Sequence, residues 1–157
     1  MSTSVAVPSV WVEHLRDAGR VALDTNARIY FLDESPGRYH LVRAAFLMTE
    51  AGELEIVIPS LVEMELVVGL LRSEDHTSLA RLDLLLDRFK GVSIAPFDRE
   101  AARSAASLRA AFSLSTPDAV VIGTAIAAGC QAVVGNDRAC ASRVSSPKYL
   151  LLDRFAA

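Results

Sequence analysis

The stretch TPDAVVIGTAIAAGCQAVVGND, residues 116–137, decides the fold of this chain. Thr116 at a cap position, Pro117 in the first turn and Gly129 at the end together predict a helix. The short apolar run at 131–135 that follows predicts a strand. A helix that leads directly into a short apolar strand is typical of α/β proteins.

The same alternation of strand and helix runs through the rest of the chain. Short apolar runs predict further strands at 20–24, 54–59, 92–96 and 149–152. The segments around them predict helices at 8–19, 26–34, 39–52, 60–73, 75–90 and 98–112, and a short helix or turn at 136–143. Ser60 and Asp98 are the expected caps of two of these helices. Strands that alternate with helices lie parallel in one sheet, so we expect an α/β fold of three layers, with a parallel central sheet flanked by helices on both faces.

Length and composition fit one soluble domain. The chain has 157 residues, of which 52% are hydrophobic and 22% charged, which is enough apolar material for a buried core. A net charge of −3 argues against a protein that coats duplex nucleic acid. The first residues lack the pattern of a secretion signal, and the apolar runs are too short to span a membrane. Cys130 and Cys140 have no zinc-site spacing, so we expect a cytoplasmic protein with reduced thiols and no membrane partner.

Acidic residues gather at one edge of the predicted sheet. Asp24 ends the strand at 20–24, Asp137 follows the strand at 131–135, and Asp118 stands just inside a helix N-terminus. In an open parallel sheet the loops after the strand ends form the usual ligand site. We therefore expect these three carboxylates to lie close together.

The helix at 60–73 offers a further carboxylate, from either Glu63 or Glu65. At roughly 100° per residue the two side chains point about 160° apart, so only one can face a common site. Apolar neighbours on both sides indicate a helix buried nearly all round, where a carboxylate needs a partner or a metal. We favour Glu65, because Gly69 one turn further on leaves room beside it.

Each acid also has a purely structural interpretation. Asp24 would cap the following helix, Asp118 would be favoured by the helix dipole, and Asp137 would start a turn beside Asn136. Taken singly, each of these interpretations is the better one. The joint placement of all the acids at one sheet edge is harder to explain in this way.

Several carboxylates that face one pocket repel one another, and without a counter-charge some of them would be protonated. A hard cation such as Mg²⁺ or Mn²⁺ removes that cost, because it prefers oxygen ligands. A metal held in this way can activate water and stabilise charge on a phosphoryl oxygen. The cluster therefore suits hydrolysis of a phosphodiester.

The ordered set of LDTN (23–26), ELVVG (65–69), TPDAVVIGTAIAAG (116–129) and VVGND (133–137) resembles the PIN domain, and within it the VapC-like ribonuclease toxins. The resemblance covers residues 20 to 153. It implies a parallel sheet flanked by helices, a Mg²⁺- or Mn²⁺-dependent endoribonuclease activity on RNA, inhibition by a VapB-like antitoxin, and a homodimer. It also makes the first nineteen residues (1–19) a helical extension in front of a single domain at 20–157.

Carried over position by position, the resemblance assigns Asp24, Glu65, Asp118 and Asp137 as the catalytic, metal-binding acids, and so selects Glu65 over Glu63. Asn26 and Asn136 match amides that accompany these acids and orient ligands or water. Thr116 is first of all a helix cap, and its hydroxyl can also bond a carboxylate or phosphate.

The segment GNDRAC (135–140) departs from the family pattern T-N-D-x-D-F. Gly135 replaces the threonine, Ala139 the second aspartate and Cys140 the phenylalanine. The missing acid leaves open whether one metal or two would bind. It also keeps open the alternative of a non-catalytic PIN module that binds RNA or a protein partner.

Other functions fit the sequence less well. A phospho-aspartate enzyme would need a second aspartate at Asn26, and there is no phosphate-binding glycine loop. The histidines have no metal-ligand spacing. Arg28 and Arg138, close to acidic motifs, would contact RNA phosphates or pair with the acids. Trp11 would pack on the chain's own core or, as the weaker alternative, face a partner.

Overall fold

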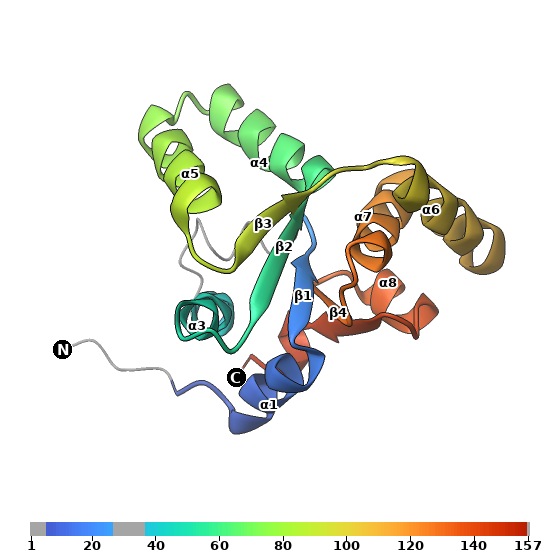
Figure 1. Cartoon of the computed structure of the whole chain (residues 1–157), viewed down its shortest axis with the longest axis horizontal. Helices are drawn as coiled ribbons and strands as arrows, with labels where there is room; N and C mark the ends of the chain where they lie inside the picture. The colour runs from blue at the N-terminus through green and yellow to red at the C-terminus, as the bar shows by residue number, and fades with distance from the viewer. Residues whose placement is uncertain (1–5, 27–36, 157) are drawn as a thin grey trace.

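The computed structural model describes residues 6–26 and 37–156 (Figure 1). Five strands form one sheet in the order β3-β2-β1-β4-β5, and every neighbouring pair is parallel. The strands are β1 (Arg20–Leu23), β2 (Glu55–Pro59), β3 (Val92–Ala95), β4 (Ala132–Gly135) and β5 (Lys148–Leu151). The predicted α/β class with a parallel central sheet is confirmed. Of the helix predicted at 26–34, only Asn26 lies within the described residues, and Arg28 lies outside them.

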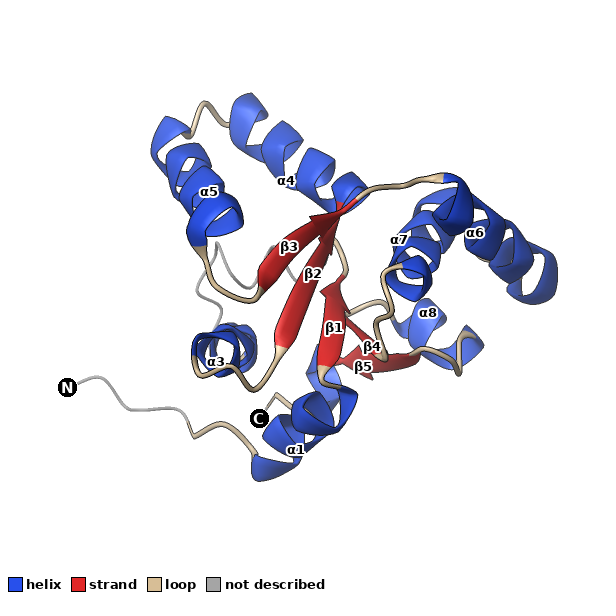
Figure 2. Ribbon diagram, in the orientation of Figure 1, coloured by secondary structure: helices blue, strands red, loops and turns tan. Residues whose placement is uncertain are grey.

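Helices cover both faces of this sheet, as Figure 2 shows. The first face carries α1 (Ser9–Ala18), α3 (Arg38–Glu50), α4 (Ser60–Arg72) and α5 (His76–Arg88). The second face carries α6 (Arg99–Phe112), α7 (Thr116–Ala127) and α8 (Arg138–Arg143). A 3₁₀ turn, η1 (Leu152–Arg154), follows β5. The three-layer arrangement expected from the sequence is therefore present.

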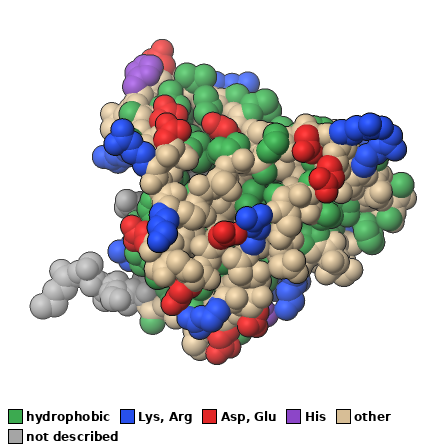
Figure 3. Space-filling view, viewed as in Figure 1, with side chains coloured by type: hydrophobic (Ala, Val, Ile, Leu, Met, Phe, Trp, Pro, Cys, Tyr) green, Lys and Arg blue, Asp and Glu red, His purple; other side chains and the backbone are tan. Residues whose placement is uncertain are grey.

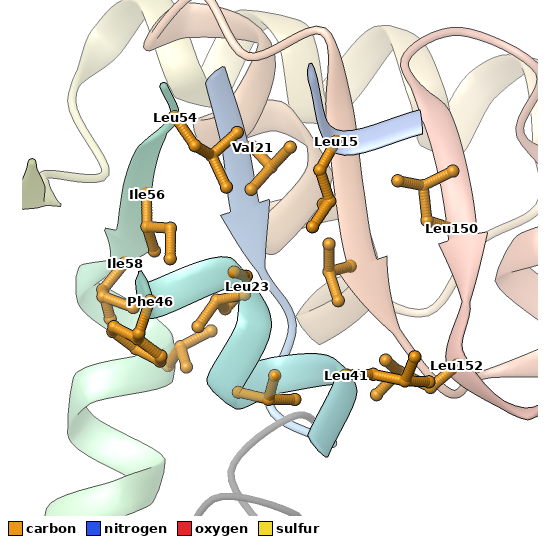
Figure 4. Close-up of a cluster of buried hydrophobic side chains, with 14 of the residues drawn as sticks. Leu15, Val21, Leu23, Leu41, Phe46, Leu54, Ile56, Ile58, Leu150 and Leu152 are labelled. Carbon is orange, nitrogen blue, oxygen red and sulfur yellow. The ribbon is translucent and has the colours of Figure 1, made fainter. Parts of the chain in front are cut away.

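Side-chain alternation along the strands divides the buried residues into two clusters. Val21 and Leu23 of β1 belong to the cluster under α1 and α3, which Figure 4 shows together with Leu41 of α3. Ala22, between them, belongs to the cluster under α6, α7 and α8. Since successive strand residues point to opposite faces, the residue after Leu23 points to the second face. That residue is Asp24.

The helix α7 is held close to α6 at Gly123. A Cβ atom at this position would lie 2.7 Å from the backbone nitrogen of Ala105 and 2.8 Å from the carbonyl oxygen of Ala101, both on α6. Only a glycine permits so close an approach without a shift of the backbone. This contact fixes the position of α7, and with it the first turn that carries Asp118.

Two predicted helix caps are wrong in detail. Helix α7 is capped by Ser115, whose hydroxyl accepts a hydrogen bond from the Asp118 N–H at 3.3 Å, and Thr116 is already its first helical residue. Ser60 is likewise the first residue of α4, after Pro59, and its side chain makes no capping hydrogen bond. The prediction for α6 is confirmed, because the Asp98 side chain accepts from the Ala101 N–H at 2.9 Å.

The expectation that α4 is buried nearly all round is also wrong. Its buried residues are Val62, Leu66 and Leu70, which repeat at helical spacing along a single stripe. Met64 is 49% exposed, and Leu71 is exposed as well. Apolar residues on every side of this helix do not imply burial on every side.

The N-terminal helix α1 belongs to the core of the domain. Trp11 is fully buried, its indole ring lies 4.9 Å from the ring of Phe155, and its Nε1–H donates to the carbonyl oxygen of Leu41 at 2.9 Å. Packing of Trp11 on the chain's own core, the favoured of the two interpretations, is what the structure shows. The division at residue 19 stays a prediction.

None of the helices within residues 6–26 and 37–156 combines the length and the apolar character that crossing a membrane requires.

Replacing Trp11 by alanine should cost about 3–5 kcal/mol of unfolding free energy, the usual effect of deleting a large buried aromatic side chain. The change removes the packing against Phe155 and leaves the Leu41 carbonyl without its indole donor. Urea unfolding followed by circular dichroism measures the loss. Val10→Ala, at an exposed position of the same helix, is the control and should change stability little. Equal stability of the Trp11→Ala variant and the wild type would contradict the assignment of α1 to the core.

Candidate metal centre

Asp24 stands directly after β1 and is buried, with only 6% of its surface exposed. Its N–H donates to the carbonyl oxygen of Val134 at 2.8 Å, which continues the pairing of β1 with β4. Its carboxylate accepts two hydrogen bonds. Oδ1 accepts from the Thr25 N–H at 2.7 Å, and Oδ2 accepts from the Tyr149 hydroxyl at 2.8 Å. Asp24 is thus more than a residue that ends a strand.

Asp137 lies two residues after β4, at the same edge of the sheet as Asp24. Its Oδ1 accepts from the N–H groups of Ala139 at 2.9 Å and Cys140 at 3.1 Å, so it caps the short helix α8. Its own N–H donates to the Tyr149 hydroxyl oxygen at 3.1 Å. The structural interpretation of Asp137 as a turn-forming residue is therefore correct, and it does not exclude a second role.

Asp118 joins this edge from the first turn of α7. One ligand atom from each of Asp118, Asp137 and Cys140 can be chosen so that all three atoms lie within 4.8 Å of one another. Asp118 and Asp137 are half-buried, whereas Cys140 is buried. The structure thus confirms that carboxylates from separate elements meet here, and it adds a thiol that the sequence analysis did not include.

The electrostatics of this group favour a cation. Burial raises the pKa of Asp24, the hydrogen bonds from Tyr149 and Thr25 lower it, and the negative charges of Asp118 and Asp137 raise it again; the net direction is upward. Burial likewise raises the pKa of the Cys140 thiol, as do the three neighbouring carboxylates, so the thiol stays protonated at neutral pH. A bound cation would offset the cost of holding these acids together.

The chemistry of the donors fits a divalent metal. The carboxylates of Asp118 and Asp137 supply hard oxygen ligands at a spacing that one ion can bridge, and the buried Asp24 adds a negative charge beside them. A neutral thiol is a weaker ligand for Mg²⁺ than a carboxylate would be. The set therefore suits a hard divalent cation bound mainly through oxygen.

The predicted acid Glu65 lies on α4, outside the group formed by Asp118, Asp137 and Cys140. It is partly exposed. Helix α4 packs against α7, so Glu65 stands on an element next to the one that carries Asp118. Its role as a fourth acid, and the choice of Glu65 over Glu63, stay predictions.

The two predicted amides differ in their surroundings. Asn136 is joined to Asp153 of η1, since its Nδ2 donates to Asp153 Oδ2 at 3.1 Å and its Oδ1 accepts from the Asp153 N–H at 3.0 Å. Asp153 also forms an ion pair of 2.7 Å with Arg38 of α3. Asn26 is half-buried in the turn after Asp24, and Thr116 is exposed at the start of α7. The assignment of these three residues to ligand binding stays a prediction.

Sequence reasoning missed Tyr149 and Cys140. Tyr149 is the first residue of a predicted strand, where an aromatic residue indicates a core position, and nothing local predicts that its hydroxyl reaches Asp24. Cys140 had a detectable signal, because it follows Asp137 by one helical turn and so lies on the same side of α8.

The surface of the domain bears both signs of charge. On the face seen in Figure 3, basic and acidic side chains form small separate groups with apolar side chains between them. Within the described residues on that face, a broad patch of one sign is absent.

Comparison with solved structures finds the same fold in chains of other proteins. A chain of VapBC2 from Rickettsia felis, solved with a promoter DNA fragment, has a TM-score of 0.66 at 20% identity, over 84% of this chain and 98% of that one. A chain of DNA-bound VapBC from Salmonella typhimurium has a TM-score of 0.63 at 22% identity, over 85% and 98%. A chain of FitAcB from Neisseria gonorrhoeae has a TM-score of 0.63 at 17% identity, over 84% and 97%. At these identities the likeness concerns the fold.

A search of curated proteins by sequence found no match. The sequence profile of the PIN domain matches residues 21–145, which include β4, all but the first residue of β1, and the acids Asp24, Asp118 and Asp137. The chain therefore belongs to the PIN domain family.

Proposed function

We propose that this protein is a metal-dependent endoribonuclease, and the toxin of a type II toxin–antitoxin pair. The observation that carries the proposal is the meeting of Asp24, Asp118 and Asp137 at the carboxyl edge of the sheet, with Asp24 buried and its pKa raised. Membership of the PIN family makes phosphodiester hydrolysis the chemistry that such a cluster serves.

The residues have separate tasks in this proposal. Asp118 and Asp137 offer oxygen ligands to Mg²⁺ or Mn²⁺, Asp24 adds the buried anionic oxygen beside them, and Glu65 of α4 supplies a fourth carboxylate. The metal, when bound, lowers the pKa of water and stabilises charge on the phosphoryl oxygen. Asn26, Asn136 and Thr116 orient the ligands or the substrate.

The proposed partners follow from the fold relatives. The solved structures with the same fold are chains of VapBC and FitAcB. We therefore propose a VapB-like antitoxin as the inhibitor of this chain. RNA is the proposed substrate, a homodimer the proposed assembly and the cytoplasm the proposed location.

A non-catalytic PIN module is the second candidate. It is favoured by Ala139, which stands where the family pattern has an acid, and by Cys140, whose neutral thiol adds no negative charge to the cluster. Such a module would bind RNA or a protein without cleaving either. A cleavage assay separates the two candidates directly.

The purified chain should cleave RNA in Mg²⁺ or Mn²⁺ and not in EDTA. Asp24→Asn and Asp118→Asn should each lower the rate at least about a hundredfold, since each removes a charge that holds the metal. Gel electrophoresis of a labelled mixture of total RNA measures the rate. Asp83→Asn, at an exposed position on α5, is the matched control and should cleave like the wild type. Absence of metal-dependent cleavage with the wild type, together with growth inhibition that the two site variants retain, would contradict the enzyme proposal.

Stability without metal gives a second test of the same site. A carboxylate with a raised pKa in the folded state stabilises the fold below its ordinary pKa, and this contribution is lost as the pH rises through the raised value. At pH 7 without metal, Asp24→Asn should therefore raise the melting temperature, by about 3 °C if the gain is near 1 kcal/mol. The gain should vanish near pH 3, where Asp24 is protonated in both states.

Adding 10 mM Mn²⁺ should reverse this order, because ligand binding to the folded state stabilises the wild type more than the variant. Differential scanning fluorimetry at both pH values measures the four melting temperatures. A lower melting temperature for Asp24→Asn than for the wild type without metal at pH 7 would show that the buried charge is already compensated, against the proposed cation site.

A further inference from the structure

The register of β4 with β5 places Tyr149 close to the edge of the sheet at which Asp24, Asp118 and Asp137 lie. Tyr149 of β5 pairs with Val133 of β4, and Leu151 pairs with Gly135, the last residue of β4. Tyr149 is therefore level with a position two residues before the end of β4. Val133, Gly135 and Tyr149 alternate onto the second face, where Asp24 also points. The distance along the strand from Tyr149 to the edge is roughly 6.6 Å at 3.3 Å per residue. A tyrosine side chain that leans along the sheet is long enough to span it.

The hydroxyl of Tyr149 reaches two segments that carry acids. It donates a hydrogen bond to Asp24 Oδ2 at 2.8 Å and accepts one from the Asp137 N–H at 3.1 Å. Asp24 follows β1 and Asp137 follows β4, whereas Tyr149 comes from β5. The hydroxyl oxygen of Tyr149, a residue of β5, thus links the segments that follow β1 and β4.

Gly135 makes this arrangement possible. A Cβ atom at position 135 would overlap the Tyr149 hydroxyl oxygen and would lie 2.8 Å from the Cβ atom of Asp24. The path of the tyrosine from β5 to Asp24 therefore runs through the space that any side chain at 135 would fill. Glycine at 135, where the family pattern has threonine, and tyrosine at 149 belong together in this chain.

We propose that Tyr149 is a positioning residue for the metal centre, whose hydroxyl fixes the orientation of the Asp24 carboxylate and its spacing from Asp137. The proposal rests on the proposed metal site, because it concerns how that site is held. With Oδ2 bound to Tyr149 and Oδ1 to the Thr25 N–H, the Asp24 carboxylate is held in one rotation. The remaining lone pairs of this carboxylate are thereby held in one orientation, close enough to Asp118 and Asp137 for their charges to raise the pKa of Asp24.

Packing alone does not account for this tyrosine. Its ring is buried in the cluster under α6, α7 and α8, with 7% of its surface exposed, and phenylalanine would fill that space equally well. The hydroxyl has both a donor and an acceptor role at one buried point. Removing the partner of a ligating carboxylate commonly costs a metal site ten- to a hundredfold in affinity.

The test is Mn²⁺ binding to the Tyr149→Phe variant. The dissociation constant, measured by electron paramagnetic resonance of free Mn²⁺, should rise about tenfold relative to the wild type. Amide hydrogen exchange followed by NMR should show faster exchange at Asp137, whose N–H loses its acceptor. Tyr39→Phe, which removes a hydroxyl from α3, is the matched control and should leave both measurements unchanged.

Gly135→Ala supplies a second variant, because its methyl group would disturb the contact between the Tyr149 hydroxyl and Asp24 without removing either side chain. It should weaken Mn²⁺ binding as Tyr149→Phe does, and adding Tyr149→Phe to it should cause little further loss. Binding is compared for folded protein, with the folded fraction of each variant set by urea titration.

The outcomes separate this inference from the proposed function. If the wild type binds Mn²⁺ and Tyr149→Phe binds it equally tightly, the positioning role is wrong and the metal site stands. If the wild type binds no Mn²⁺, both the metal site and the role of Tyr149 fail. If Tyr149→Phe loses stability but keeps its Mn²⁺ affinity, the hydroxyl is structural and the proposal is overturned.

Discussion

The burial of the Asp24 carboxylate is the constraint on which the acidic edge depends. An ionised carboxylate in an apolar setting is costly unless it is hydrogen-bonded and paired with a positive charge. Asp24 has the hydrogen bonds, from Thr25 and Tyr149, but its charged neighbours are Asp118 and Asp137. Burial and the two neighbouring acids together raise the pKa of Asp24, and this is the cost that the proposed cation would offset.

The sequence predicted those parts of the fold that depend on local patterns. The strand at 131–135 and the helix before it were recognisable because capping residues, an apolar run and a terminal glycine stand in the order that a helix and strand require. Asp24 and Asp137 are predictable for a related reason, since each follows one of two parallel strands that end at a common edge. For these two acids, position in the chain translates almost directly into position in space, whereas Asp118 reaches the edge from the first turn of α7.

Features that depend on contacts between distant elements were not predictable in this way. Ser115 rather than Thr116 caps α7, and the two residues differ only in which of them takes the extended backbone conformation. The exposure of Met64 on α4 depends on where that helix leaves the sheet. Tyr149 and Gly135 are linked through the register of β4 with β5, and a shift of that register by one residue would turn Tyr149 to the other face.

The segment that carries Asp137 is held from two directions. Tyr149 binds its backbone from the second face of the sheet, and Asn136, the residue before it, is joined through both amide atoms to Asp153. Asp153 is in turn paired with Arg38, at the start of α3 on the first face. Because Trp11 of α1 donates to Leu41 of that same helix, the contacts that fix Asp137 extend to the N-terminal helix. The acidic edge is therefore supported from both layers of helices, which is the rigidity that a site built from carboxylates on separate elements requires.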